Sequence, residues 1–196
     1  MEFQNARILI LSGEDPWLVP NVTRALYKAG LEFTHLQVAS FSHERGKAFQ
    51  IFSKFHPIDL LKVAFDVLKN RSLKRPKTIS KIEVDYTLIS KYDYVFLINY
   101  PYRIKLDKFP RNLFNCHPSL LPKYKGLMPI KRMFDDREFS AMGASIHLVD
   151  AEIDTGEVIW TQKIEAVSIY QAYLLSYLSF SSGIRKIVSS DIRARH

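Results

Sequence analysis

Residues 7–39, RILILSGEDPWLVPNVTRALYKAGLEFTHLQVA, hold three successive patterns that decide the fold class. The run at 7–13 is almost continuously apolar and ends in glycine, which is typical of a strand buried on both faces. Residues 17–29 then carry apolar side chains at helical spacing before Gly30, and residues 31–39 alternate as a second strand. This order predicts a βαβ unit and therefore a parallel sheet.

The middle of the chain continues this alternation of strands and helices. Apolar periodicity predicts a helix within residues 46–70 and two more buried strands, within 92–100 and 112–117. Between them, residues 71–80, RSLKRPKTIS, are expected to form an exposed loop.

The last third of the chain changes character. Residues 128–138 suit a helix, with proline in its first turn, and residues 140–150 and 157–166 alternate as two antiparallel strands. Residues 168–188 predict one long or interrupted helix with Ser168 as a possible N-cap. We therefore expect residues 1–196 to form one α/β domain: a Rossmann-like, mostly parallel sheet with helices on both faces, followed by an antiparallel strand pair and a helix.

Composition places the chain among ordinary soluble globular proteins. Of its 196 residues, 47% are hydrophobic and 24% are charged, and no apolar run approaches the ~18 residues that a membrane span needs. The N-terminus, MEFQNARILILSGEDPW, lacks the features of a signal peptide. Cys116 is the only cysteine, so no internal disulfide can form, which fits the reducing cytoplasm.

The net charge of +8 raises nucleic acid as a partner, but the basic residues are scattered and no RNA-binding signature accompanies them. An anionic small molecule would explain the same charge, and nucleic acid is the less expected partner. A solvated loop is the simplest interpretation of the one dense basic group: Lys69, Arg71, Lys74, Arg75 and Lys77.

The stretch FNCHPSLLPKYKG, residues 114–126, places Asn115 and His117 at the end of a predicted strand, before a rigid path set by prolines. Downstream, Asp154 lies on a turn just before another strand. Taken singly, Asn115 would be a turn residue and Asp154 a turn or cap residue. His117 alone would be a structural histidine, as we expect His147 to be on its strand. Together, at the strand ends of a parallel sheet, they supply an amide, an imidazole and a carboxylate to one site.

Cys116 lies between the two candidate residues and would make a tempting nucleophile. Because side chains alternate along a strand, Cys116 points away from its neighbours. We therefore expect it to be a core residue.

NCHPSLLPKYKGLMPI at 115–130, followed by Asp154 within VDAEIDTGEVI, resembles the catalytic core of folate-dependent formyltransferases. The resemblance implies transfer of a formyl group from N10-formyltetrahydrofolate to a primary amine. Asn115 and His117 would donate hydrogen bonds to the oxyanion of a tetrahedral intermediate, which the rigid loop positions in advance. Asp154 would hold the imidazolium or take the proton of the amine.

The resemblance also implies where the two substrates lie, and it implies no metal. The pterin end of the folate is expected between two loops, while Gly126 and Lys123 are expected on the acceptor side. The residues expected to bind the folate are Tyr100, Pro101, Tyr102, Arg103, Ile104, Val149, Asp150, Ala151, Glu152 and Ile153.

Several members of this family differ from the chain. The length leaves no room for the RNA-binding domain of a methionyl-tRNA formyltransferase or the regulatory domain of a formyltetrahydrofolate hydrolase. Glu14 and Asp15 would repel the phosphate that a purine transformylase binds after its first strand. By elimination, we expect the acceptor to be a nucleotide-linked amino sugar.

Other interpretations remain open at this point. The acceptor could be glycinamide ribonucleotide. The chain could also be another folate-dependent formyltransferase or a hydrolase. The chain could also be a catalytically silent or RNA-binding module. The aromatic tail after residue 168 could form a homodimer surface or pack on the chain's own core.

Overall fold

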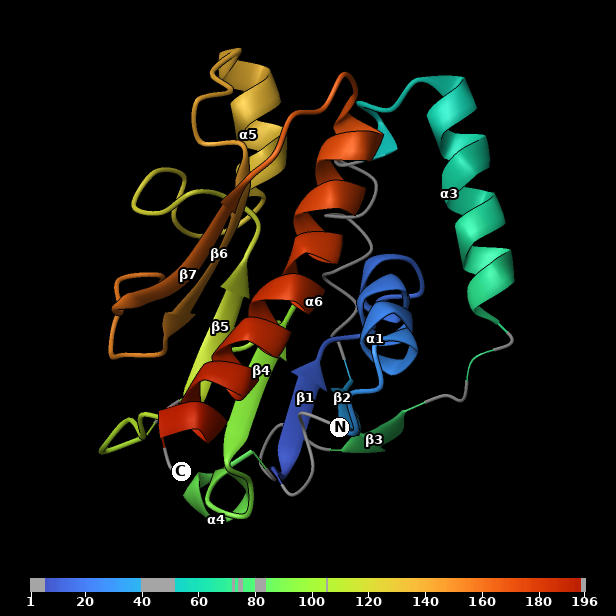
Figure 1. The fold of residues 1–196 in the computed structure, drawn as a ribbon. Coiled ribbons are helices and arrows are strands. Elements are labelled where there is room, and N and C mark those ends of the chain that lie inside the picture. Colours follow the sequence, from blue (N-terminus) through green and yellow to red (C-terminus); the bar gives the residue numbers. More distant parts are fainter. Residues whose placement is uncertain are drawn as a thin grey trace.

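The computed structural model describes residues 6–39, 52–71, 73, 76–79, 84–104 and 106–194. Seven strands of these residues form one sheet in the order β3-β2-β1-β4-β5-β6-β7 (Figure 1). The strands from β3 to β5 pair in parallel, and β6 and β7 run antiparallel, as the sequence predicts. Their bounds are β1 Ile8–Ser12, β2 Thr34–Val38, β3 Lys77–Ile79, β4 Tyr94–Ile98, β5 Leu113–His117, β6 Gly143–Leu148 and β7 Val158–Lys163.

The two central strands explain why their sequences read as continuous apolar runs. Every residue of β1 and β4 is buried, because helices or loops cover both faces of the sheet at this point. Ile8 and Ile10 face one half of the core, and Leu9 and Leu11 face the other. A strand buried on both faces has no polar side to produce an alternating pattern.

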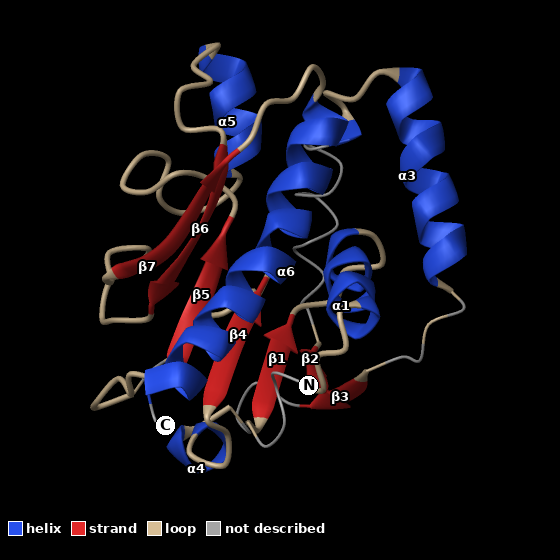
Figure 2. Cartoon of the chain, viewed as in Figure 1, coloured by secondary structure: helices blue, strands red, loops and turns tan. Residues whose placement is uncertain are grey.

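The helices cover the two faces of the sheet unequally (Figure 2). The first core half is closed by α1, α5 and α6, with α3 contributing Val63. The second half is closed by the short α4 and by the chain that follows β4. The helices span α1 Leu18–Lys28, α3 Pro57–Asn70, α4 Tyr86–Ile89, α5 Pro129–Asp136 and α6 Ile169–Ala194.

The C-terminal segment forms one continuous helix, α6, which packs on β6 and β7 and against α1 (Figure 1). The Ser168 Oγ accepts a hydrogen bond of 3.3 Å from Gln171 N, so Ser168 caps the helix as predicted. Tyr173, Tyr177 and Phe180 are buried in the core, so these aromatic side chains of the tail pack inside the chain. Within the described residues, neither α6 nor any other helix combines the length and the apolar character that a membrane crossing requires.

Two short elements depart from the sequence prediction. The segment 71–80 was expected to be a loop, but residues 77–79 form the edge strand β3, and α4 was not predicted. Each has four residues or fewer, which is too short for a periodic pattern to show. The helix expected within 46–70, from the periodicity of residues 58–70, is confirmed as α3, Pro57–Asn70.

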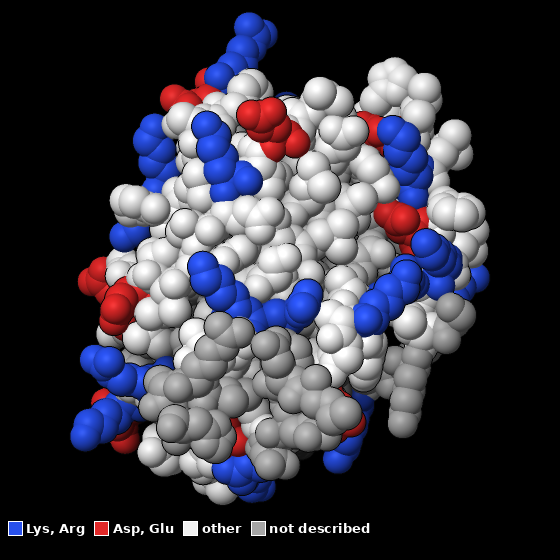
Figure 3. All heavy atoms as spheres, in the orientation of Figure 1, with Lys and Arg blue, Asp and Glu red and all other residues white. Residues whose placement is uncertain are grey.

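Lysine and arginine side chains are spread over the visible face rather than gathered in one patch (Figure 3). Of the dense basic group, Lys69, Arg71 and Lys77 are described, whereas Lys74 and Arg75 lie outside the described residues. The described part of the group lies in α3, at its end and in β3. This distribution agrees with the scattered charge seen in the sequence.

A half-buried histidine in the sheet, His35, predicts how stability depends on pH. His35 Nε2 lies 3.0 Å from the Ser12 Oγ, and burial lowers the pKa of His35 from 6.5 to about 4. Since the folded-state pKa is depressed, this contribution to stability is complete above pH 6.5 and is lost as the pH falls towards about 4. Its full size is at most about 3 kcal/mol.

We expect His35→Gln, which keeps a polar partner for Ser12 but does not titrate, to flatten the fall in melting temperature over this pH range. Thermal unfolding of both proteins at a series of pH values measures the difference. Identical slopes would show that His35 does not contribute.

Candidate active site

Strand β5 delivers Asn115 and His117 to the same side of the sheet, because alternate residues of a strand share a face. Cys116 between them points to the opposite side, where it is 4% exposed within the core. Burial raises the pKa of its thiol, which disfavours a nucleophilic thiolate. The prediction that Cys116 is a core residue is confirmed.

Asp154 comes from the turn that joins β6 to β7. Its φ of 55° lies in the left-handed region, which asparagine and aspartate tolerate better than most residues. Two residues later, a Cβ at Gly156 would overlap the carbonyl oxygen of Leu148, so only glycine lets the turn fold back so closely. The tight turn between β6 and β7 places the carboxylate of Asp154 next to the end of β5.

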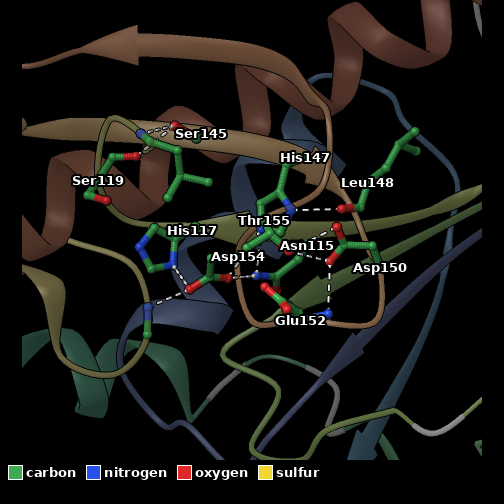
Figure 4. A network of polar contacts seen from close by, with 12 residues as sticks. Asn115, His117, Ser119, Ser145, His147, Leu148, Asp150, Glu152, Asp154 and Thr155 are labelled. Atoms are coloured by element: carbon green, nitrogen blue, oxygen red, sulfur yellow. Dashed lines mark hydrogen bonds and ion pairs between the residues drawn. The ribbon is translucent and has the colours of Figure 1, made fainter. Parts of the chain in front are cut away.

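The carboxylate of Asp154 joins the two side chains of β5 (Figure 4). Its Oδ1 accepts a hydrogen bond of 3.0 Å from Asn115 Nδ2, and its Oδ2 lies 3.1 Å from His117 Nδ1. The Oδ2 also accepts a hydrogen bond of 2.7 Å from Gly126 N. The structure therefore brings together the three residues that the sequence singled out, with Gly126 beside them.

The second ring nitrogen of His117 also has an oxygen partner. Its Nε2 lies 2.9 Å from the carbonyl oxygen of Tyr124, in the loop that follows β5. Burial lowers the pKa of His117, and this effect outweighs the opposing influence of the Asp154 charge and of the Tyr124 carbonyl. The imidazole therefore releases a proton more readily than an exposed histidine.

Asp154 is held in its charged form. Burial alone would raise its pKa, but the hydrogen bond from His147, the charge of His117 and the N–H of Gly126 together lower it. At neutral pH, the centre of this cluster is a carboxylate that lies among hydrogen-bond donors.

His147 joins the cluster, although the sequence assigned it only a structural place on its strand. It lies opposite Asn115 in the antiparallel register of β5 and β6. Its Nδ1 is 2.8 Å from the Leu148 carbonyl, and its Nε2 lies 3.1 Å from Asn115 Nδ2 and 3.3 Å from Asp154 Oδ1. The pairing of these two strands is the signal that would reveal its position, and residue spacing alone does not contain it.

A cavity of about 920 Å³ opens beside the cluster, at the edge of the sheet where β1, β4 and β5 end. Asn115, His117, Gly126 and Asp154 line one end of it. Most of the residues expected to bind the folate also line it: Tyr100, Pro101, Tyr102, Arg103, Ile104, Val149, Asp150, Glu152 and Ile153. The helices α1, α3 and α6 supply a largely apolar and aromatic wall that includes Trp17, Leu18, Val63, Val67, Tyr173 and Tyr177.

The two loops expected to hold the folate contact each other. The guanidinium of Arg103 donates a hydrogen bond to the carbonyl of Ala151, which is not itself among the lining residues. The hydroxyl of Tyr102 donates to the Ala39 carbonyl at 2.7 Å. Burial, followed by the proximity of Tyr102, raises the pKa of Tyr100 to about 12. The loops thus form one side of the cavity, where the Tyr100 hydroxyl stays neutral.

Lys123 lies outside this cavity. Its Nζ donates to Ser140 Oγ at 2.9 Å, and it lines a separate hollow of about 520 Å³ with Tyr124, Lys125 and Arg132. Gly126, by contrast, lies at the cavity with a φ of +81°, a value that favours glycine. Of the two residues predicted on the acceptor side, the structure brings only Gly126 to the cluster.

The family model described as "Formyl transferase" matches residues 6–175 of the chain. The chain therefore belongs to the formyl transferase family, and the predicted resemblance is confirmed. The family uses N10-formyltetrahydrofolate as its formyl donor.

A relative with a known function agrees with this assignment. The methionyl-tRNA formyltransferase of Finegoldia magna is 35% identical over 120 residues, which cover 58% of this chain and 37% of that protein. The chain thus spans well under half the length of this curated relative.

Solved structures confirm the predicted α/β fold. The phosphoribosylglycinamide formyltransferase of Coxiella burnetii superposes with a TM-score of 0.61 at 16% identity, covering 98% of this chain and 89% of that one. The formyltransferase PseJ of Anoxybacillus kamchatkensis, solved with a UDP-linked formamido sugar and tetrahydrofolate, superposes with a TM-score of 0.53. It is 18% identical, with 93% of this chain and 76% of that one covered. At these identities the likeness concerns the fold alone.

Proposed function

We propose that residues 1–196 act as one catalytic domain that transfers a formyl group from N10-formyltetrahydrofolate to a primary amine. The observation that carries this proposal is the carboxylate of Asp154, which binds both Asn115 and His117 at the end of a 920 Å³ cavity. Two donors fixed in this way need little rearrangement when negative charge develops next to them.

In the proposed reaction, the amine nitrogen attacks the formyl carbon and forms a new C–N bond. The carbonyl electron pair moves to oxygen, and the resulting oxyanion accepts hydrogen bonds from Asn115 and His117. Asp154 takes the proton of the positively charged nitrogen, directly or through a water molecule. The intermediate then collapses, the bond to N10 breaks, N10 gains a proton, and the formamide and tetrahydrofolate leave.

This role requires both donors to change partners. In the structure, His117 Nε2 faces the Tyr124 carbonyl, and Asn115 Nδ2 faces Asp154 and His147. As the reaction proceeds, His117 would exchange the Tyr124 carbonyl for the oxyanion, and Asn115 would exchange one of its two partners. Catalytic hydrogen bonds often reach their final geometry only when the substrate is bound.

The folate is proposed to lie between the loops at 99–104 and 149–153, with its pterin ring near Tyr100 and Ile104. These residues line the cavity and offer both apolar surface and backbone polar groups. Arg103 would stabilise this arrangement through its contact with Ala151.

The proposed acceptor is a nucleotide-linked amino sugar. The apolar side chains that line the cavity alongside its carboxylates suit the body of a sugar ring. PseJ was solved in complex with a UDP-linked formamido sugar, and glycinamide ribonucleotide remains the alternative acceptor. We also propose that the enzyme works in the cytoplasm, which suits its single buried cysteine.

The test is an activity screen with N10-formyltetrahydrofolate and a panel of nucleotide-linked amino sugars, glycinamide ribonucleotide, or water alone. Release of tetrahydrofolate with an amino sugar, together with formation of the formamide, is the expected result. Turnover only with glycinamide ribonucleotide or only with water would overturn the proposed acceptor. The absence of turnover with every amine, in protein that binds tetrahydrofolate, would overturn the transferase activity.

A further inference from the structure

The carboxylate of Asp15 caps the N-terminus of helix α1. Its Oδ1 accepts hydrogen bonds from Trp17 N at 2.8 Å and from Leu18 N at 2.7 Å, and its Oδ2 accepts one of 3.0 Å from Asn99 Nδ2. Asp15 itself lines the cavity. The side chain therefore ties the loop after β1 to the loop after β4 at the edge of the cavity.

Free N–H groups at the start of a helix form a ready site for a phosphate group, because they donate hydrogen bonds along a favourable dipole. Here an internal carboxylate already occupies two of these groups. A phosphate that entered this end of the cavity would have to displace Asp15 and lose its contact with Asn99 as well.

The charges of the cavity act in the same direction. Among its described lining residues, the only lysine or arginine is Arg103, whose guanidinium donates to the Ala151 carbonyl. The lining residues with carboxylates are Glu14, Asp15, Asp150, Glu152 and Asp154. The cavity is thus acidic in a chain whose net charge is +8. Negative groups are therefore disfavoured next to Glu14 and Asp15, even though the whole molecule attracts them.

We propose that Asp15 is a specificity-determining residue, which excludes acceptors that carry a phosphate at the α1 end of the cavity. Next to Asp15, the cavity instead favours an uncharged or cationic body, such as the ring of an amino sugar. This inference rests on the proposed function and refines it: the phosphates of a nucleotide-linked acceptor lie away from α1. Burial raises the pKa of Asp15, and the hydrogen bonds from its N–H donors oppose this rise only in part. The exclusion of phosphate therefore depends on the occupied N–H groups more than on the charge of the carboxylate.

The experiment measures binding of inorganic phosphate by calorimetry, at constant ionic strength, to the full chain saturated with tetrahydrofolate. Asp15→Ala frees both N–H groups, and we expect it to bind phosphate at least about tenfold more tightly than the wild type. Asp15→Asn keeps an oxygen on the same N–H groups, so its affinity is expected to stay close to that of the wild type. If Asp15→Ala fails to fold, Asp15→Gly replaces it, because glycine is well tolerated near a helix start.

Asp85→Ala is the matched control. Asp85 Oδ1 caps α4 through a hydrogen bond of 2.8 Å to Leu88 N, and Asp85 does not line the cavity. Its loss removes an equivalent cap and is expected to leave phosphate binding unchanged. Equal phosphate affinity in the wild type and Asp15→Ala would overturn the inference, as would an equal gain in Asp15→Asn.

Binding of tetrahydrofolate, measured first in the same instrument, separates the two proposals. A wild type that binds no tetrahydrofolate would contradict the proposed function. A wild type that binds tetrahydrofolate and also binds phosphate as tightly as Asp15→Ala would contradict only the role of Asp15.

Discussion

Asp154→Asn is expected to lower kcat/KM for formyl transfer on the order of 10³-fold. The substitution keeps the shape of the side chain and suits the left-handed backbone at this position, where φ is 55°. It removes the negative charge that lies 3.1 Å from His117 Nδ1, and with it the group proposed to take the proton of the amine. Steady-state kinetics with the acceptor identified in the screen measure the loss.

Asp135→Asn is the control for this variant. Asp135 pairs with Lys54 at 2.9 Å and also with Lys131, but it does not line the cavity. Its loss is expected to change the rate by no more than about twofold, as is usual for a pair on the surface. Circular dichroism and melting temperatures would show that both variants fold. An Asp154→Asn protein that retained more than a tenth of the wild-type rate would contradict the proposed role.

Asn115→Ala is expected to lower kcat between about 10²- and 10³-fold with little change in KM, since the lost donor acts on charge that exists only in the transition state. The amide is also one of the donors that hold Asp154, through the 3.0 Å hydrogen bond from its Nδ2. Because the two side chains act as a unit, the double variant with Asp154→Asn is expected to be less impaired than the product of the two single effects.

Asn112→Ala provides the comparison on the same segment. Asn112 precedes β5 and donates a hydrogen bond of 2.7 Å from Nδ2 to the Tyr92 carbonyl, at the end of the strand far from the cavity. Its loss is expected to lower the melting temperature slightly and to leave kcat unchanged. Near-native turnover by Asn115→Ala would show that its amide does not stabilise the intermediate.

The sheet could be predicted from sequence wherever burial imposes a strong pattern. β1 and β4 are apolar along their whole length because both of their faces are covered, and α6 has both a long apolar periodicity and a capping serine. β3 could not be predicted, because three residues after a basic segment contain no pattern and its pairing with β2 depends on the rest of the sheet. Short edge elements depend on tertiary contacts that a local sequence does not encode.

The site shows the same division between local and long-range information. Asn115, His117 and Asp154 were found because their motifs resemble those of a known family, and only the fold explains why residues 37 positions apart touch. His147 was taken as structural because its contact with Asn115 depends on the register of β5 and β6. Lys123 was expected near the acceptor, but the chain beyond Pro122 turns it towards Ser140.

The close fit at Gly156 restricts how this protein can change over evolution. Nothing larger than hydrogen fits against the Leu148 carbonyl, so the turn between β6 and β7 tolerates neither a bulkier residue there nor an insertion that would separate Asp154 from the end of β5. The length of this hairpin thus sets the position of the Asp154 carboxylate. New acceptors would have to be accommodated by other lining residues, such as the exposed Leu127.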